Sequence, residues 1–252
     1  MIALISPAKT LDFETKSPIE KTTTPIFINE ANRLSKALSE LTIEELIVLM
    51  RTSKDLAILN YSRIKLWKNR PADKDIKQSL LAYKGEAFRG IDAYSLNKDD
   101  FDFAQNHVRI LSGLYGILRP LDGIQAYRLE MRTNLKHENF TNLYSFWGNT
   151  ITQQINQEHK EKDYIINLAS NEYFKAIKPK ILKGKIITPV FKDFNKGKLK
   201  VVTVYAKKAR GQMIRYIIKN RITKPEQLKL FDINGYSFDD KFSDDNQWVF
   251  VR

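Results

Sequence analysis

Strand-like and helix-like patterns alternate along this chain, and this alternation restricts the fold more than any other feature of the sequence. The first apolar run, residues 2–6, stops at Pro7 and is typical of a buried strand. Residues 30–69 then carry leucines at helical spacing, and β-rich runs follow residue 163. No Pro/Gly/Ser-rich linker, internal repeat or low-complexity tract interrupts the chain. The sequence therefore predicts one mixed α/β (α+β) domain over residues 1–252.

Helix starts are marked by capping residues. Thr42 followed by Glu45 forms a capping-box pattern before an apolar run. Asp99, Asp100 and Asp102 stand where the first turn of a helix over residues 99–111 is expected, and the helix dipole favours acids there. Further helices are predicted over residues 53–67, 145–158 and 208–221.

The β-rich runs lie mainly in the second half of the chain. Strands are predicted over residues 164–168, 185–188, 199–205 and 248–251. The stretch Asn195–Lys198 is a turn signal, so it is expected to join its flanking strands in a hairpin.

The absence of cysteine excludes several kinds of chemistry. Disulfides, iron–sulfur clusters, thiolate zinc sites and thiol-based peroxidases all need a cysteine, and the chain has none. The histidines, His107, His137 and His159, form no i, i+4 pair. We therefore expect no metal site, no cofactor and no peroxidase activity. With no run of 18 apolar residues and no secretory signal, a cytoplasmic protein without a membrane partner is expected.

Positive charge is concentrated in one segment. Residues 178–224 contain 15 Lys or Arg residues and a single acid, Asp193. The net charge of this segment is therefore +14, whereas that of the whole chain is +13. The remaining 205 residues sum to −1. Such asymmetry is typical of a surface that binds a polyanion. A lysine-rich surface that only keeps the protein soluble is the alternative.

The predicted helix over residues 208–221 combines a basic stripe with an apolar one. Lys208, Arg215 and Lys219 fall within about 40° of one another on a helical projection, and Lys207 precedes them. This stripe is suited to following phosphates. Arg210 falls on the apolar side. Either the helix starts after Gly211, or Arg210 is held in a cleft by an acid or a ligand.

The segment Leu111–Asp122 contains two glycines, Gly113 and Gly116. Its Leu-Ser-Gly-Leu-Tyr-Gly run resembles the turn of a helix-hairpin-helix element, which would span about residues 100–130. In such a turn, Gly113 and Gly116 would leave backbone amides free to donate to a DNA phosphate, with Arg119 close by. Ser112 stands where a proline is common, and Pro120 comes early for a long second helix. A simple glycine-containing connection is the alternative.

A second group of candidate residues follows the predicted strands. Lys9 comes after the first strand, and Asn167 and Ser170 follow the strand over residues 164–168. Loops at strand ends are common ligand sites, so these residues are expected to share a cleft with Arg128 and Glu130. A solvated loop lysine is the alternative for Lys9. None of these residues forms a recognisable catalytic set, P-loop or nucleophile elbow.

Ordered blocks along the whole chain resemble the peroxide stress protein YaaA family. They are Ile5–Asp12, Tyr83–Gly85, Asp100–Gln105, Leu111–Asp122, Tyr127–Met131, Phe146–Gly148, Asn167–Ser170, Tyr205–Gly211 and Asn220–Leu228.

The resemblance implies a cytoplasmic protein that helps cells survive hydrogen peroxide and is linked to limited intracellular iron and to DNA protection or repair. It also implies a mixed α/β fold peculiar to the family, with a positively charged cleft and a helix-hairpin-helix element that binds duplex or branched DNA. Sequence-independent DNA binding without an obligate protein partner is the predicted function. The alternative is an enzyme that acts in the basic cleft on DNA or on a small phosphorylated metabolite.

Overall fold

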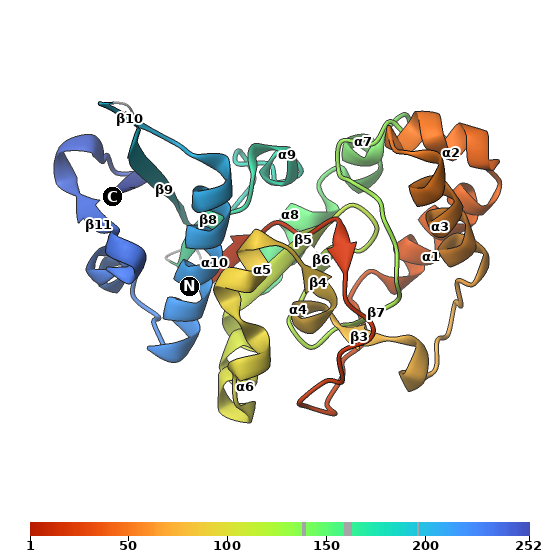
Figure 1. Cartoon of the computed structure of the whole chain (residues 1–252), viewed down its shortest axis with the longest axis horizontal. Coiled ribbons are helices and arrows are strands. Elements are labelled where there is room, and N and C mark those ends of the chain that lie inside the picture. Colours follow the sequence, from red (N-terminus) through yellow and green to blue (C-terminus); the bar gives the residue numbers. More distant parts are fainter. Residues whose placement is uncertain (138–139, 159–162, 196) are drawn as a thin grey trace.

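The central feature of the computed structural model is one mostly parallel sheet, shown in Figure 1. The structure describes residues 1–137, 140–158, 163–195 and 197–252. Within these residues the strands follow the order β11-β12-β9-β8-β1-β5-β6, and β10 pairs with β9. Their bounds are β1 Ile2–Ile5, β5 Val108–Ser112, β6 Gly116–Leu118, β8 Tyr164–Leu168, β9 Lys185–Asn195, β10 Lys198–Lys200, β11 Ser237–Asp239 and β12 Gln247–Val251.

Strand β1 lies in the middle of the sheet and is buried along its whole length. It pairs in parallel with β5 on one side and with β8 on the other. Strands β9 and β12 continue the parallel arrangement, whereas β6, β10 and β11 pair antiparallel. The prediction of a mixed α/β domain is therefore confirmed.

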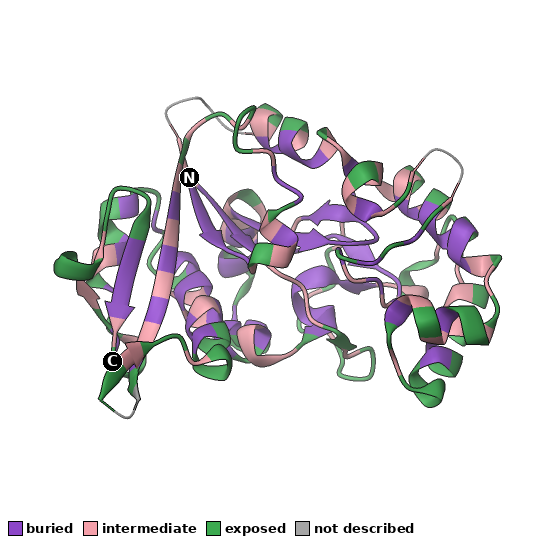
Figure 2. Ribbon diagram, turned by 90° about the horizontal axis from the view of Figure 1, so that it is seen from above, coloured by how far each residue is buried: buried purple, intermediate pink, exposed green. Residues whose placement is uncertain are grey.

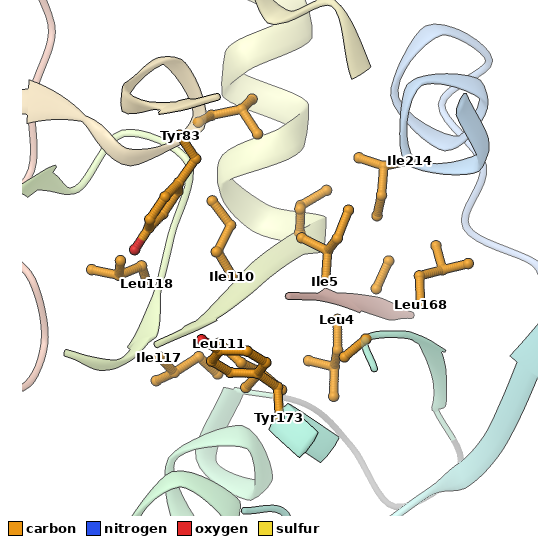
Figure 3. Packing of buried hydrophobic residues seen from close by; sticks show 14 of the residues in the cluster. Leu4, Ile5, Tyr83, Ile110, Leu111, Ile117, Leu118, Leu168, Tyr173 and Ile214 are labelled. Carbon is orange, nitrogen blue, oxygen red and sulfur yellow. The ribbon is translucent and has the colours of Figure 1, made fainter. Parts of the chain in front are cut away.

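Helices cover both faces of this sheet. Figure 3 shows Ile5 of β1 on the same side as Ile214 of α10 (Thr203–Lys219), whereas Leu4 faces Tyr173 of α9 (Asn171–Phe174). The other long helices are α1 Ile28–Ser39, α2 Ile43–Met50, α3 Lys54–Lys65, α6 Lys98–His107 and α8 Thr150–Glu158. Shorter elements are β2 Thr10–Leu11, β3 Lys77–Gln78, α4 Ser79–Ala82, β4 Tyr83–Lys84, α5 Glu86–Ile91, β7 Gly123–Ile124 and α7 Leu143–Trp147. Figure 2 shows burial concentrated along the sheet and its inner helix faces.

Local capping signals were reliable guides to the helices. The Thr42–Glu45 capping box is present at the start of α2, as predicted. Ser53 caps α3 by accepting a hydrogen bond from the backbone N–H of Leu56. Between these helices Arg51 adopts a left-handed conformation with φ of 47°. Helices α2 and α3 therefore form a tight helical hairpin.

The prediction of a helix-hairpin-helix element over about residues 100–130 is wrong. Helix α6 ends at His107, and the expected continuation to residue 111 is strand β5 instead. Every residue of β5 is buried, because this strand packs beside β1 in the sheet. The glycine-containing segment joins β5 to β6 in an antiparallel β-hairpin, with Ser112 opposite Gly116.

Three other boundaries differ from the prediction. The helix expected over residues 145–158 is divided into α7 and α8 by Gly148, which has a φ of 47°. The strand expected over residues 199–205 is shorter, because β10 ends at Lys200 and α10 begins at Thr203. The β9–β10 hairpin is present as predicted, although Lys196 in its turn lies outside the described residues.

Gly116→Ala is expected to destabilise the protein. Gly116 has a φ of 68°, and an added Cβ would lie 2.7 Å from the ring of Trp147. Left-handed strain of about 1 kcal/mol and overpacking of about 1–3 kcal/mol together give a loss of roughly 2–4 kcal/mol. Denaturant unfolding measures this loss. Gly235→Ala is the control, since its φ is 76° but the added Cβ meets only ordinary contacts; equal losses would contradict the packing argument.

Candidate functional site at the carboxyl ends of β1 and β8

The loops that follow β1 and β8 meet at one edge of the sheet. Because these strands are parallel neighbours, Ser6 and Ser170 lie side by side. The backbone N–H of Ser170 donates to Ser6 Oγ at 2.8 Å, and the two hydroxyls are 3.2 Å apart. Asn167 is buried at the end of β8, where its Oδ1 accepts from the N–H of Ala169 and its Nδ2 donates to Thr188. Asn167 thus holds the loop in shape.

The carboxylate of Glu130 forms ion pairs with three cations beside this edge. Its oxygens lie 3.0 Å from Lys9 Nζ, 3.2 Å from Arg128 Nη2 and 3.6 Å from Arg132 Nη2. Arg132 also approaches Glu172 of α9, at 3.8 Å. The structure therefore brings together three of the candidate cleft residues, Lys9, Arg128 and Glu130, and links them to the loop after β8.

A cavity of 480 Å³ opens beside these charges. Lys9, Glu130 and Arg132 line one side of it, and residues 48–51 at the end of α2 line another. The site is therefore built from the loop after β1, the segment that carries Glu130, and the α2–α3 hairpin.

Glu130 is a carboxylate at neutral pH. Burial alone would raise its pKa, but the hydrogen bonds and charges of Lys9 and Arg128 outweigh burial and lower the pKa below its ordinary value. Its ion pairs therefore stabilise the fold above about pH 4.5, and this contribution is lost as the pH falls through the lowered pKa. A group with this pKa is an anchor for cations and not a general acid.

Arg210 has an unusual environment. Helix α10 begins at Thr203, so the alternative that the helix starts after Gly211 is wrong. The Nε atom of Arg210 is buried and has no hydrogen-bond partner, and burial lowers the pKa of the Arg210 guanidinium. The structure shows no acid partner for Arg210 among the described residues.

The predicted basic stripe on α10 is divided between two roles. Arg215 donates to the carbonyl oxygens of Ile91 and Asp92 at the end of α5, at 2.9 and 3.0 Å. Lys219 pairs with Asp100 of α6 at 3.0 Å. These two cations join α10 to its neighbouring helices, whereas Lys207 and Lys208 are exposed.

The glycines of the predicted hairpin are not at the surface. Gly113 and Gly116 are buried, and a Cβ on Gly113 would lie 2.3 Å from the carbonyl oxygen of Leu129. Arg119 pairs with Asp122 at 2.9 Å and donates to Thr24 O. The expected phosphate contacts of Gly113 and Gly116 are therefore wrong, because the sheet and Trp147 cover this segment.

Sequence reasoning missed a buried chain of hydroxyls near the same edge. Tyr127 OH lies 2.5 Å from Tyr83 OH and 2.6 Å from Ser112 Oγ. Burial raises the pKa of Tyr127 to about 12, so it is neutral at physiological pH. These residues lie far apart in sequence, and no spacing pattern connects them.

A buried ion pair between Asp12 and Lys77 was also missed. Lys77 Nζ lies 3.5 Å from Asp12 Oδ1 and donates to Thr15 O at 2.7 Å. Hydrogen bonds from the backbone and side chain of Thr15, with the charge of Lys77, outweigh burial and lower the pKa of Asp12 to about 2.

Asp12→Asn is expected to reduce stability at neutral pH but hardly at low pH. The lowered pKa contributes about 2 kcal/mol above pH 4, and this contribution disappears as the pH falls towards 2. Denaturant unfolding of both proteins across this range measures the difference between their free energies of unfolding. A difference that is the same at both ends of the range would contradict the assignment.

Among the residues that the structure describes, no three His, Asp or Glu side chains are grouped so that they could hold a metal ion. His159 lies outside these residues. No described helix is long and apolar enough to cross a membrane.

Comparison with known proteins identifies the family. The family model described as "Peroxide stress protein YaaA" matches residues 1–242. A UPF0246 protein of Clostridium perfringens strain SM101 is 52% identical over 255 residues, covering 100% of both chains. A UPF0246 protein of Teredinibacter turnerae is 47% identical over 254 residues, covering 100% of this chain and 99% of the relative. With its whole length matched in this way, the chain belongs to the peroxide stress protein YaaA family.

Proposed function

We propose that this protein binds DNA without sequence preference, and that in the cytoplasm it protects DNA and helps to limit intracellular iron during peroxide stress. The observation that carries the DNA-binding proposal is a basic surface at one end of the molecule. This surface, called here the lysine surface, consists of Lys198, Lys200, Lys207 and Lys208. All four are exposed, and none forms an ion pair with a described acid.

The residues of the lysine surface are close together in the sequence. Lys198 and Lys200 lie on β10, and α10 begins three residues after that strand ends. Phe194 on the paired strand and Tyr205 in the first turn of α10 are exposed beside them, at 67% and 49%. Lysines next to aromatic rings are typical of surfaces that contact a phosphate backbone and its bases.

The packing of α10 supports binding without base readout. Gly211 and Gly90 bring α10 and α5 into backbone contact, so the middle of α10 is covered. Only its first turns are free to approach DNA, and a helix held in this way cannot enter a major groove along its length. Lysine contacts with phosphates position a duplex but carry no sequence information.

The helical hairpin that the chain does contain adds a second candidate contact. The turn between α2 and α3 exposes Arg51 and Lys54, and the first amides of α3 lie at the positive end of its dipole. We assign to this α2–α3 turn the contact with DNA phosphates that the sequence predicted for Gly113 and Gly116.

A salt series tests the proposal. Binding to several unrelated duplexes and to one branched junction is measured by fluorescence anisotropy at increasing salt. Contact with three or four phosphates predicts a slope of about −3 for log affinity against log salt, with similar affinities for all duplexes. Binding that is unaffected by salt, or confined to one sequence, would overturn the proposal.

A further inference from the structure

Two arginines at the candidate site leave polar atoms buried without partners. The Nε atoms of Arg128 and Arg210 are both buried, and neither N–H has a hydrogen-bond acceptor among the described residues. The Arg128 side chain is only 13% exposed and reaches Glu130 through Nη2. A buried guanidinium N–H without an acceptor costs free energy, so such groups are normally satisfied by an acid or by a ligand.

Both arginines are connected to the loop after β1 through their neighbours. Arg128 shares Glu130 with Lys9 of that loop. Arg210 precedes Gly211, which packs on Ala87 of α5, and the residue before α5, Gly85, packs on Ala8 of the same loop.

Helix α10 packs on the sheet one turn after Arg210. Figure 3 shows Ile214 of this helix facing Ile5 and Leu168, the last residues of β1 and β8. Gly211, the neighbour of Arg210, contacts Ala87, two residues after Gly85. Arg210, one turn before Ile214, therefore lies on the part of α10 that contacts α5 next to the loop after β1.

We propose that this edge binds a compact oxyanion, the phosphate group of a small phosphorylated molecule, with Lys9, Arg128 and Arg210 as its cationic donors. Arginine forks match the geometry of phosphate oxygens, and the carboxyl ends of parallel strands are common ligand sites. The hydroxyls of Ser6 and Ser170 lie at the same edge.

The site differs from the lysine surface in its accessibility. Lys198, Lys200, Lys207 and Lys208 are exposed, as contacts to a DNA backbone must be, whereas Arg128 is almost entirely covered. A duplex cannot bring its backbone to a buried guanidinium, so the proposed ligand is a single phosphate group. This proposal goes beyond DNA binding and does not depend on it.

Thermal unfolding in the presence of inorganic phosphate or pyrophosphate tests the proposal, with potassium chloride at equal ionic strength as reference. Either probe is expected to raise the Tm of the wild-type protein by a few degrees. Arg210→Met and Arg128→Met are expected to lose at least ten-fold in affinity for the probe, measured by calorimetry. Lys36→Met is the matched control, because it removes an exposed cation from α1, outside both proposed binding surfaces, and is expected to keep the full response.

The variants without ligand give a second readout. Removing an unpaired buried charge is expected to leave the Tm of ligand-free Arg210→Met equal to or above that of the wild type, whereas a purely structural arginine would lower it. If Arg210→Met does not fold, Arg210→Gln takes its place. Equal phosphate responses in the wild type and the arginine variants would overturn the proposal. A second result would also overturn the proposal. If Arg210 were needed for a preference for 5′-phosphorylated over 5′-hydroxyl oligonucleotides, and neither phosphate nor pyrophosphate gave a response, the ligand would be a DNA end.

Discussion

Replacing the four residues of the lysine surface with glutamine is expected to lower affinity for duplex DNA by about three orders of magnitude near 0.1 M salt. Each lost phosphate contact makes the slope of log affinity against log salt shallower by about 0.9. Between 1 M and 0.1 M salt, this change in slope corresponds to almost one decade of affinity. The substituted residues are Lys198, Lys200, Lys207 and Lys208. All four are exposed and without ion-pair partners among the described acids, so folding should not be affected.

The matched control removes the same charge elsewhere. Lys16, Lys36, Lys74 and Lys98 are also exposed, and they lie on the N-terminal loops and helices, away from β10 and the start of α10. Their replacement with glutamine is expected to change affinity only through the lower net charge. If both quadruple variants lost the same affinity, DNA would be attracted by total charge and not by this surface. The phosphate response at Arg128 and Arg210 is expected to survive in both variants.

Local sequence signals predicted the structure where one short segment decides it. The capping box at Thr42 and the cap at Ser53 depend only on side chains within one turn, and both are present. The first strand was predicted because an apolar run that ends at proline leaves little other choice. Its partners come from residues more than a hundred positions away, so the strand order was not predictable from such signals.

The glycine-containing segment shows why a motif can mislead. Gly113 is required because Leu129 O leaves no room for a Cβ, and Gly116 because of its positive φ and its contact with Trp147. Both requirements arise from packing between distant segments. A glycine in a helical turn and a glycine in a buried β-hairpin are identical in the sequence, so the spacing alone did not distinguish them.

The candidate site was accessible to sequence reasoning only in part. The expectation that loops at strand ends share a cleft pointed to Lys9, Arg128 and Glu130, and the structure places these three in contact. The ion pair of Asp12 with Lys77 was missed because nothing in either segment reveals that Lys77 is buried. Arg210 is the instructive case, since its misfit on the apolar side of a helix was visible in the sequence.

Gly211→Ala is expected to cause a net loss of stability of about 2 kcal/mol or more. A Cβ on Gly211 would lie 1.7 Å from the carbonyl oxygen of Ala87, and one on Gly90 would lie 2.2 Å from that of Lys208. These are backbone atoms of two packed helices, so no side chain can rotate away. Overpacking of about 3 kcal/mol or more should exceed the gain of about 1 kcal/mol from the helix propensity of alanine.

Denaturant unfolding measures the loss, with Lys207→Ala as the control on the same helix. Lys207 is exposed, so its replacement is expected to change the free energy of unfolding by less than about 0.5 kcal/mol. A Gly211→Ala protein as stable as Lys207→Ala would show that α5 and α10 are not in backbone contact.

The same substitution connects the fold to the proposed anion site. If Gly211→Ala folds at low temperature, α10 and α5 must move apart to accommodate the methyl group. That movement shifts Arg210, the neighbour of Gly211, and it shifts Gly85, which packs on Ala8 in the loop that carries Lys9. The folded variant is therefore expected to respond to phosphate at least ten-fold more weakly, although no proposed ligand-binding residue has been replaced. An unchanged phosphate response in a folded but destabilised variant would mean that the helix crossing does not set the position of Arg210.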